Sequence, residues 1–181
     1  MPAHRSFLIA ALSLASFACS SVDVNPATTD DIVAAAGSAS DASFDGKTTY
    51  SWGGSLSEII ASTRAWKQPD PDLIASIQRE TDQALASHGM TKVDVGADVL
   101  VYHGVGADLA AMNLIDGVDF QTSTIDPMAK AGVAIVLVDA ATSKRLWAGI
   151  ATGDIDWTPT EESVATRVAY AVDRMFADFP N

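Results

Sequence analysis

The sequence predicts an α+β fold: a two-layer sandwich with two long helices on one face of a mainly antiparallel sheet of about four strands. Two segments, residues 71–88 and 159–178, repeat apolar residues at helical spacing. Four shorter segments are rich in β-branched and aromatic residues, which favour strands. Their order along the chain, β-α-β-β-β-α, is typical of helices packed on one antiparallel sheet.

The composition fits one domain of ordinary size. The chain has 181 residues, of which 48% are hydrophobic and 19% charged, values typical of a globular protein. We divide it into a signal peptide at 1–18, a lipidated N-terminus with a tether at 19–42, and a single α/β domain at 43–181.

The first 18 residues have the layout of an export signal. A polar start with one fixed positive charge, Arg5, precedes the 11-residue apolar run Phe7–Phe17. That length suits the apolar part of a signal peptide and is too short to cross a bilayer. Ala18 is small enough for a cleavage site, so the sequence predicts an exported precursor.

The single cysteine, Cys19, directly follows Ala18. This position resembles a bacterial lipoprotein signal, in which the cysteine carries fatty-acyl chains such as palmitate, although Ser16 and Phe17 depart from the usual pattern. Several chains on one residue would anchor the protein stably. Ser20 in place of Asp, by the same resemblance, implies the outer membrane, facing the periplasm. The alternative is an ordinary secretory leader and a soluble periplasmic or secreted protein.

The segment before the domain is rich in Ser, Ala, Thr and Asp, which suits a flexible tether. A short edge strand at 22–25 is an alternative there. The first strand of the domain is expected at Thr48–Trp52, because aromatic and β-branched residues end at Gly53 and Gly54.

The first helix has clear boundaries. Asp70 suits the N-cap, Pro71 suits the first helical position, and Gly89 is the expected stop. Its apolar stripe consists of Leu73, Ile74, Ile77, Thr81, Ala84 and Leu85.

Three more strands and a helix follow. Asp98–Val105 has the composition of a strand, and Val133–Val138 is apolar on both faces, which indicates a central strand with Arg145–Ala151 as its hairpin partner. The last helix is expected to begin with a capping box at residues 158–161. Its apolar stripe consists of Val164, Val168, Ala171, Val172, Met175, Phe176 and Phe179.

A long connection at 106–131 has no regular period, and such loops are often functional. Met112, Leu114, Ile115 and Phe120 make it too apolar for a solvated linker. Because the central strand is apolar on both faces, we expect this loop to cover the face opposite the helices, with help from residues 55–66 or a second copy. A loop that binds a partner is the alternative.

The net charge of the chain limits the kinds of partner that it is expected to bind. The chain has 11 basic and 23 acidic side chains, a net charge of −12, and loss of Arg5 with the leader makes it −13. Such a chain repels phosphate backbones, so no nucleic acid is expected, and a membrane is reached only through the lipid. An envelope protein or a second copy of the chain remains as the expected partner.

No cofactor, metal site or catalytic residue is predicted. The mature chain has two histidines, and His88 is explained by its place at a helix C-terminus. Asp154 and Asp156 lack the further ligands of a calcium loop, and there is no Gly-x-Ser-x-Gly motif. His103, with Met112, Leu114 and Ile115, is kept as a candidate ligand or partner contact, against the simpler interpretation of a packed strand residue.

Six short motifs along the chain carry a family resemblance: Phe44 with Thr49–Trp52, Ala84–Met90, Ala97–His103, Val138–Ala140, Lys144–Gly149 and Phe176–Pro180. In this order they resemble the bacterial lipoproteins of the domain-of-unknown-function 4136 (DUF4136) family. The resemblance implies a lipidated envelope protein with a two-layer α/β domain and brings no catalytic residues.

Two functions are therefore expected from the sequence. The first is a non-enzymatic binding or scaffolding lipoprotein of the cell envelope. The alternative is a periplasmic enzyme with a site near His103 and the 106–131 loop. A pocket that joins His103 to two or more carboxylates would favour the enzyme.

Overall fold

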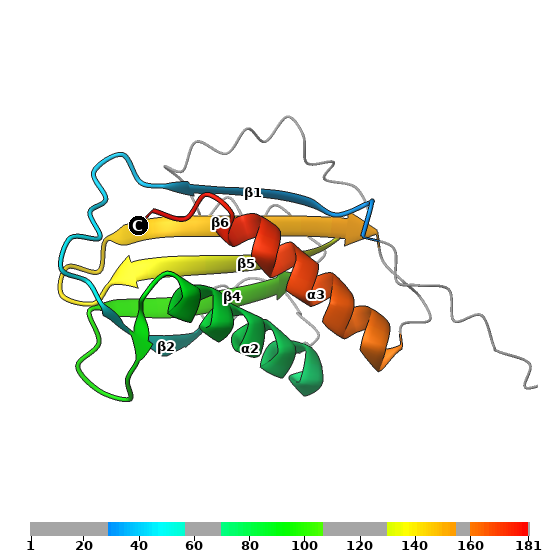
Figure 1. Cartoon of the computed structure of the whole chain (residues 1–181), viewed down its shortest axis with the longest axis horizontal. Helices are drawn as coiled ribbons and strands as arrows, with labels where there is room; N and C mark the ends of the chain where they lie inside the picture. The colour runs from blue at the N-terminus through cyan, green and yellow to red at the C-terminus, as the bar shows by residue number, and fades with distance from the viewer. Residues whose placement is uncertain (1–28, 57–69, 107–129, 155–159, 181) are drawn as a thin grey trace, which may run out of the picture.

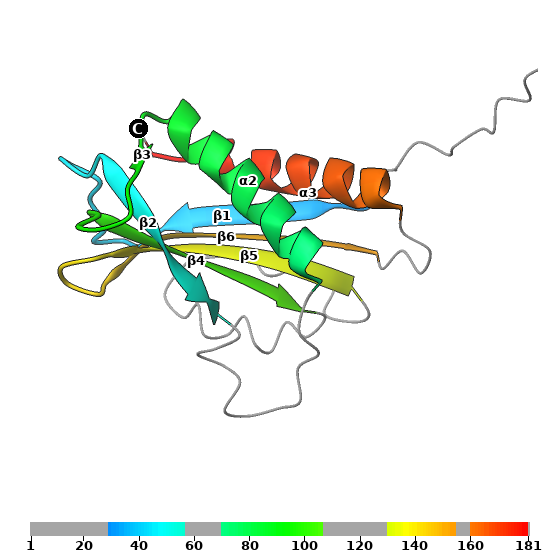
Figure 2. The same ribbon diagram turned by 90° about the horizontal axis from the view of Figure 1, so that it is seen from below.

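One sheet carries both helices on the same face (Figures 1 and 2). The structure is a computed structural model that describes residues 29–56, 70–106, 130–154 and 160–180. The elements are β1 (Val33–Ser38), β2 (Thr49–Ser55), α2 (Pro71–Ser87), β3 (Thr91–Lys92), β4 (Val99–Gly106), β5 (Lys130–Asp139), β6 (Arg145–Asp154) and α3 (Glu161–Phe176).

The sheet has six strands in the order β1-β6-β5-β4-β2-β3 and is mixed. The pairs β1/β6, β6/β5 and β5/β4 are antiparallel, whereas β2 runs parallel to both β4 and β3. The chain passes from β2 to β3 and β4 by way of α2. A strand–helix–strand crossover of this kind brings its two strands into the sheet in parallel.

The α+β class and the two helices are confirmed. The prediction of about four, mainly antiparallel strands is wrong in detail, because the sheet has six strands and is mixed. β1 lies inside the segment 19–42 that composition assigns to the tether. Its sequence, VAAAGS, has little intrinsic strand preference, and each of its six residues is paired with β6. Pairing with a distant strand therefore decides its conformation. The alternative strand at 22–25 lies outside the described residues.

α2 agrees with the prediction at both ends. The Asp70 side chain accepts a hydrogen bond from the Asp72 backbone N–H, and Pro71 is the first helical residue. Gly89 follows the C-cap with a φ of +81°, a left-handed conformation that glycine adopts without strain.

α3 begins later than predicted. Its N-cap is Thr160, whose hydroxyl accepts from the Ser163 N–H, while the Ser163 hydroxyl accepts from the Thr160 N–H. The capping box predicted at residues 158–161 is therefore displaced to 160–163. The physical reason is that the Ser163 hydroxyl makes the return bond that the prediction assigned to Glu161.

The main core fills the space between the helices and the sheet. At the C-terminal end of α3, the Trp147 ring packs against Phe176 and Phe179 with ring centroids 4.6 and 5.4 Å apart. Gly149 lets α3 approach β6, because a Cβ there would lie 3.0 Å from the Met175 Cβ. Aromatic side chains thus close this end of the sandwich.

β5 is an interior strand, as predicted, and buries side chains on both faces. Ile135 and Leu137 belong to the core under the helices, whereas Ala134 and Val136 belong to a second cluster with Ala148 and Ile150 on the other face. Leu56, from the segment 55–66 expected to help cover that second face, packs against this cluster. The loop residues Met112, Leu114, Ile115 and Phe120 lie outside the described residues. Their role there stays a prediction.

Candidate functional site: an apolar cavity at one end of the sheet

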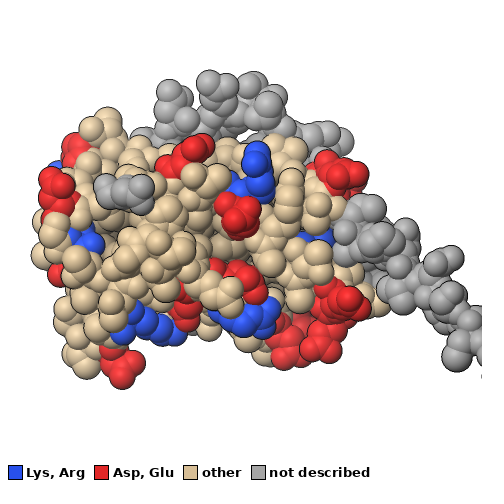
Figure 3. Space-filling model, in the orientation of Figure 1, with Lys and Arg blue, Asp and Glu red and all other residues tan. Residues whose placement is uncertain are grey.

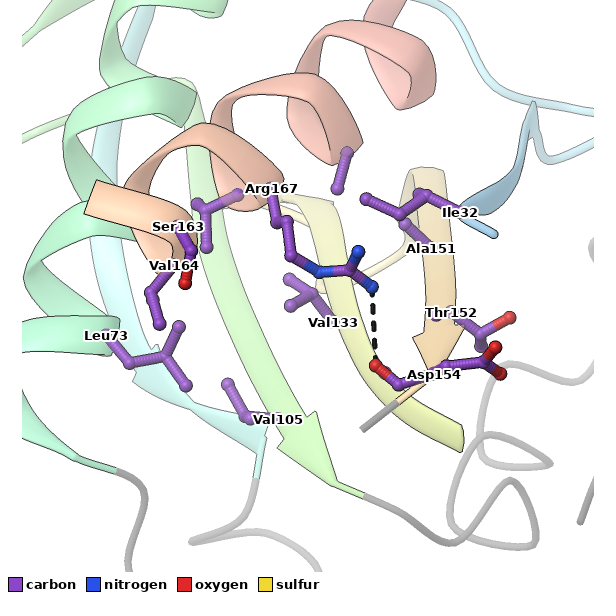
Figure 4. A pocket seen from close by; sticks show the side chains of 14 residues that line it. Ile32, Leu73, Val105, Val133, Ala151, Thr152, Asp154, Ser163, Val164 and Arg167 are labelled. Atoms are coloured by element: carbon purple, nitrogen blue, oxygen red, sulfur yellow. Dashed lines mark hydrogen bonds between the residues drawn. The ribbon is translucent and has the colours of Figure 1, made fainter. Parts of the chain in front are cut away.

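A cavity of about 260 Å³ opens between the sheet and the first halves of the two helices (Figure 4). α2 contributes Leu73, and α3 contributes Ser163, Val164, Arg167, Val168 and Ala171. The remaining walls come from the ends of β4, β5 and β6 and from the residue before β1: Ile32, Val105, Gly132, Val133 and Ala151–Asp154.

Small side chains explain why the cavity exists at this end. α3 presents aromatic Phe176 to the sheet at its C-terminal end but Val164, Val168 and Ala171 toward its N-terminus. Valine and alanine do not fill the space that aromatic rings fill at the other end. The apolar stripe of α3 is therefore continuous in sequence but leaves space beneath its first three turns.

An ion pair, here called the clasp, lies beside the cavity. The two terminal guanidinium nitrogens of Arg167 donate to the Asp31 carboxylate at 2.8 and 2.6 Å. The Asp154 backbone N–H donates to the same carboxylate at 2.6 Å. The hydrogen bonds from Arg167 lower the Asp31 pKa to about 2. The clasp thereby joins the segment before β1 to both α3 and the end of β6.

The lining residues suit binding better than catalysis. No histidine or cysteine is among the 14 residues that line the cavity. The Ser163 hydroxyl is engaged in the helix cap. Successive side chains of a strand point to opposite faces of the sheet. Ala151 faces the helices, so the side chain of Thr152 lies on the opposite face of β6. Burial of apolar surface is what this space offers a ligand.

His103 is packed in the core and is not among the residues that line this cavity. Its side chain is 5% exposed, and its ring lies 5.7 Å from the Trp52 ring in an edge-on arrangement. It comes two residues before Val105, which does line the cavity. The other sequence candidates, Cys19, Met112, Leu114 and Ile115, lie outside the described residues.

Comparison with known proteins identifies the domain. A family model described as "Domain of unknown function (DUF4136)" matches residues 36–181, most of the chain. The chain belongs to this family. The resemblance found in the sequence is thus confirmed, and residues 36–181 are called the DUF4136 domain below.

Solved structures give distant likenesses. A PelC dodecamer from Paraburkholderia phytofirmans is 15% identical with a TM-score of 0.44, over 80% of this chain and 97% of that one. A leucine-to-methionine variant of that dodecamer is 13% identical with a TM-score of 0.42, over 78% and 94%. A PDZ domain protein from Parabacteroides distasonis ATCC 8503 is 13% identical with a TM-score of 0.49, over 83% and 37%. No curated protein matches the sequence.

A second polar group in the DUF4136 domain links α2 to the sheet. The Tyr50 hydroxyl and the Trp52 indole N–H donate to one oxygen of Asp82 at 2.9 and 3.0 Å. Lys92 donates to its other oxygen at 2.9 Å. Burial, together with the bond to Asp82, raises the Tyr50 pKa far above its ordinary value. Every one of these contacts fixes one element against another, so we interpret this group as structural.

A third polar group surrounds the β5–β6 turn. The Asp139 carboxylate accepts from the Thr142 N–H at 2.7 Å and pairs with Lys47. These contacts hold the Asp139 pKa far below its usual range. Because they satisfy the carboxylate within a tight turn, we interpret them as structural too.

Within the described part of the chain, no three His, Cys, Asp or Glu side chains gather closely enough to hold a metal ion. Of the two carboxylates that the sequence analysis weighed against a calcium loop, Asp154 is described and Asp156 lies outside the described residues. The helices of the described part are also too short or too polar to cross a membrane.

Sequence reasoning missed the cavity and its clasp. The one local signal was Arg167, a charged residue between Val164 and Val168 of an apolar stripe. Its partner, Asp31, lies 136 positions away in a segment that resembles a linker. No spacing pattern joins residues so far apart.

Proposed function

We propose that the protein is an exported lipoprotein, anchored through Cys19 to the periplasmic face of the outer membrane, and that its DUF4136 domain binds another molecule without catalysis. The observation that carries the binding role is the apolar cavity, beside which Arg167 is paired with Asp31 and the Ser163 hydroxyl is bonded to Thr160. Cavities of this kind, mostly apolar with a few polar groups at the edge, are the usual form of a ligand site.

The layout of the chain supports the anchor. The apolar run Phe7–Phe17, Ala18 and Cys19 precede the family match, which begins at residue 36. An acyl group on Cys19 would therefore lie outside the folded domain. The domain is free to bind while the lipid holds the protein at the membrane.

The position of His103 supports binding over the enzyme alternative. A hydrolytic or acid–base site would need His103 at a pocket with carboxylates. Its ring instead packs against Trp52 and lies outside the set of residues that line the cavity.

Cys19→Ser tests the anchor. We expect wild-type protein in the outer-membrane fraction with incorporated labelled palmitate, and the variant in the soluble periplasmic fraction without label. Ser20→Ala is the matched control and should behave as wild type, because it leaves the thiol in place. If wild type and Cys19→Ser fractionate alike as soluble proteins, the anchor is disproved.

Photo-crosslinking in intact cells tests the binding role. A photoreactive residue at Leu73, on the cavity wall, or at Met112, in the predicted loop, should capture an envelope protein, a lipid or a second copy of the chain. The same residue at Val95, which is 88% exposed and away from the cavity, is the control. Identical products from all three positions would contradict a specific binding site.

A further inference from the structure

We propose that the cavity binds the alkyl tail of a separate amphiphile whose head group is uncharged or cationic. This inference rests on the proposed binding role and names its ligand. It is carried by the walls of the cavity, by its volume and by the charges around its opening.

The walls favour an aliphatic tail. Leu73, Val105, Val133 and Val164 pack against the core but are only partly buried, so a ligand would bury their remaining surface. Removal of this apolar surface from water favours binding. None of the 14 lining residues is aromatic, so a flat ring would find no stacking partner.

A peptide backbone fits these walls less well. Aliphatic side chains supply no hydrogen-bond partners for buried amide groups, and burial of an unpaired amide opposes binding. The polar groups at the edge, Arg167 and Asp31, already bond to each other. An alkyl chain has no polar groups to satisfy.

The volume sets the length of the tail. A cavity of about 150 Å³ lined by aliphatic and aromatic side chains holds a benzene molecule of six carbon atoms. By the same ratio, the 260 Å³ found here holds about ten carbon atoms. A longer chain would extend out of the opening.

The charges at the opening select the head group. Asp31 neutralises Arg167, while the Asp154 side chain is exposed. Asp72 lies in the first turn of α2, and Glu161 and Glu162 lie in the first turn of α3, the helix ends nearest the cavity.

Figure 3 shows acidic side chains gathered at the lower right, over the N-terminal ends of the two helices. The helix dipole explains why these acidic residues stand there, because it favours carboxylates in the first turn of a helix. Their combined field repels an anionic head group and attracts a cationic one.

Three amphiphiles with the same ten-carbon tail test the proposal: decyltrimethylammonium, decyl maltoside and decyl sulfate, each below its micelle-forming concentration. The protein is the full-length chain with Cys19→Ser, so that no covalent acyl group competes. Calorimetry should show saturable one-to-one binding, tightest for the cation and at least about tenfold weaker for the anion, a difference that shrinks with added salt.

Valine-methyl NMR places the bound tail. The signals of Val105, Val133, Val164 and Val168 should shift on binding, whereas that of exposed Val95 should not. Val164→Phe, which fills the cavity, should weaken all three probes about tenfold or more, and Val95→Phe should not.

Glu162→Lys reverses a charge at the opening and leaves the cavity walls intact, because Glu162 is exposed in the first turn of α3 and is not among the lining residues. It should narrow the preference for cation over anion and leave decyl maltoside binding unchanged. This second variant keeps the proposal testable if Val164→Phe fails to fold.

Three results would overturn the proposal: no saturable binding of any probe, shifts confined to other valines, or tightest binding of decyl sulfate. If acylated wild-type protein already shows the valine spectrum of the bound state, its own lipid fills the cavity and a separate amphiphile is excluded. None of these results alters the outcome of the Cys19 fractionation test, so the two proposals fail separately.

Discussion

Single residues decide how the edge strand β1 is held to the domain. Asp31 accepts three hydrogen bonds from two elements, two from the Arg167 guanidinium and one from the Asp154 N–H. Gly153 leaves room for this, since a Cβ there would lie 2.7 Å from an Arg167 nitrogen and 3.0 Å from an Asp31 oxygen. The clasp therefore depends on the glycine as well as on the two charges.

Asp31→Asn should weaken the clasp. The amide keeps one acceptor oxygen but loses the negative charge. Because the ion pair is partly exposed to solvent, we expect the free energy of unfolding to fall by only about 1 kcal/mol. Urea denaturation at pH 7 measures this. Asp41→Asn is the matched control, because Asp41 pairs with Lys144 through side chains that are 66% and 68% exposed. Equal losses in the two variants would show that the clasp is an ordinary surface ion pair.

At the scale of elements, α2 is attached to the sheet by polar contacts as well as apolar ones. Asp82 reaches across to two aromatic residues of β2, Tyr50 and Trp52. It sits on α2 one position after buried Thr81, at the margin of the helix face that meets the sheet. The aromatic residues thus bury their rings in the core while their polar groups share one carboxylate.

Asp82→Ala should be more damaging than its partial exposure suggests. Removal of the carboxylate leaves the Tyr50 hydroxyl without its acceptor, and Tyr50 is only 2% exposed. We expect the free energy of unfolding to fall by about 1–3 kcal/mol. Tyr50→Phe in the Asp82→Ala background should recover part of that loss. Denaturation of the two single variants and the double variant measures the coupling, and strictly additive losses would contradict it.

The start of α3 offers a test of helix register. Thr160→Ala removes the side-chain acceptor for the Ser163 N–H and should destabilise the protein by about 1 kcal/mol. Thr158→Ala, at the N-cap that the sequence suggested, is the control and should cost less. Thermal unfolding of both variants decides between the two positions, and a larger effect at Thr158 would contradict the cap seen in the structure.

At the scale of the whole molecule, acidic groups set the pH range of stability. Asp31, Asp98 and Asp139 all have a pKa below the usual 3.8, because hydrogen bonds and neighbouring cations favour their charged forms. A depressed folded-state pKa means that the unfolded chain binds protons more readily. The stability that these groups contribute is therefore complete above about pH 4 and is lost as the pH falls toward about 2.

Urea denaturation between pH 7 and pH 2 should show this loss. The free energy of unfolding should fall below about pH 4, with proton uptake on unfolding. Asp139→Asn should be less stable than wild type at pH 7 and should show a shallower fall in acid. A free energy that is constant down to pH 2 would contradict the assigned pKa directions.

The sequence by itself determined the local features of this protein. The two helices, their apolar stripes, the stop at Gly89 and the interior position of β5 follow from spacing, capping residues and a run of apolar residues, all of which act within a few positions of the chain. The order of these pieces also carried the family resemblance, which the match over residues 36–181 confirms.

Only the tertiary structure decided the features that join distant residues. β1 is a strand because β6 offers it an edge, β2 is parallel to β4 because α2 lies between them in the chain, and Asp31 meets Arg167 across 136 positions. The cavity exists because small α3 side chains face the ends of β4, β5 and β6, a meeting that no single segment encodes. Such contacts depend on the packing of whole elements, and local sequence constrains that packing only weakly.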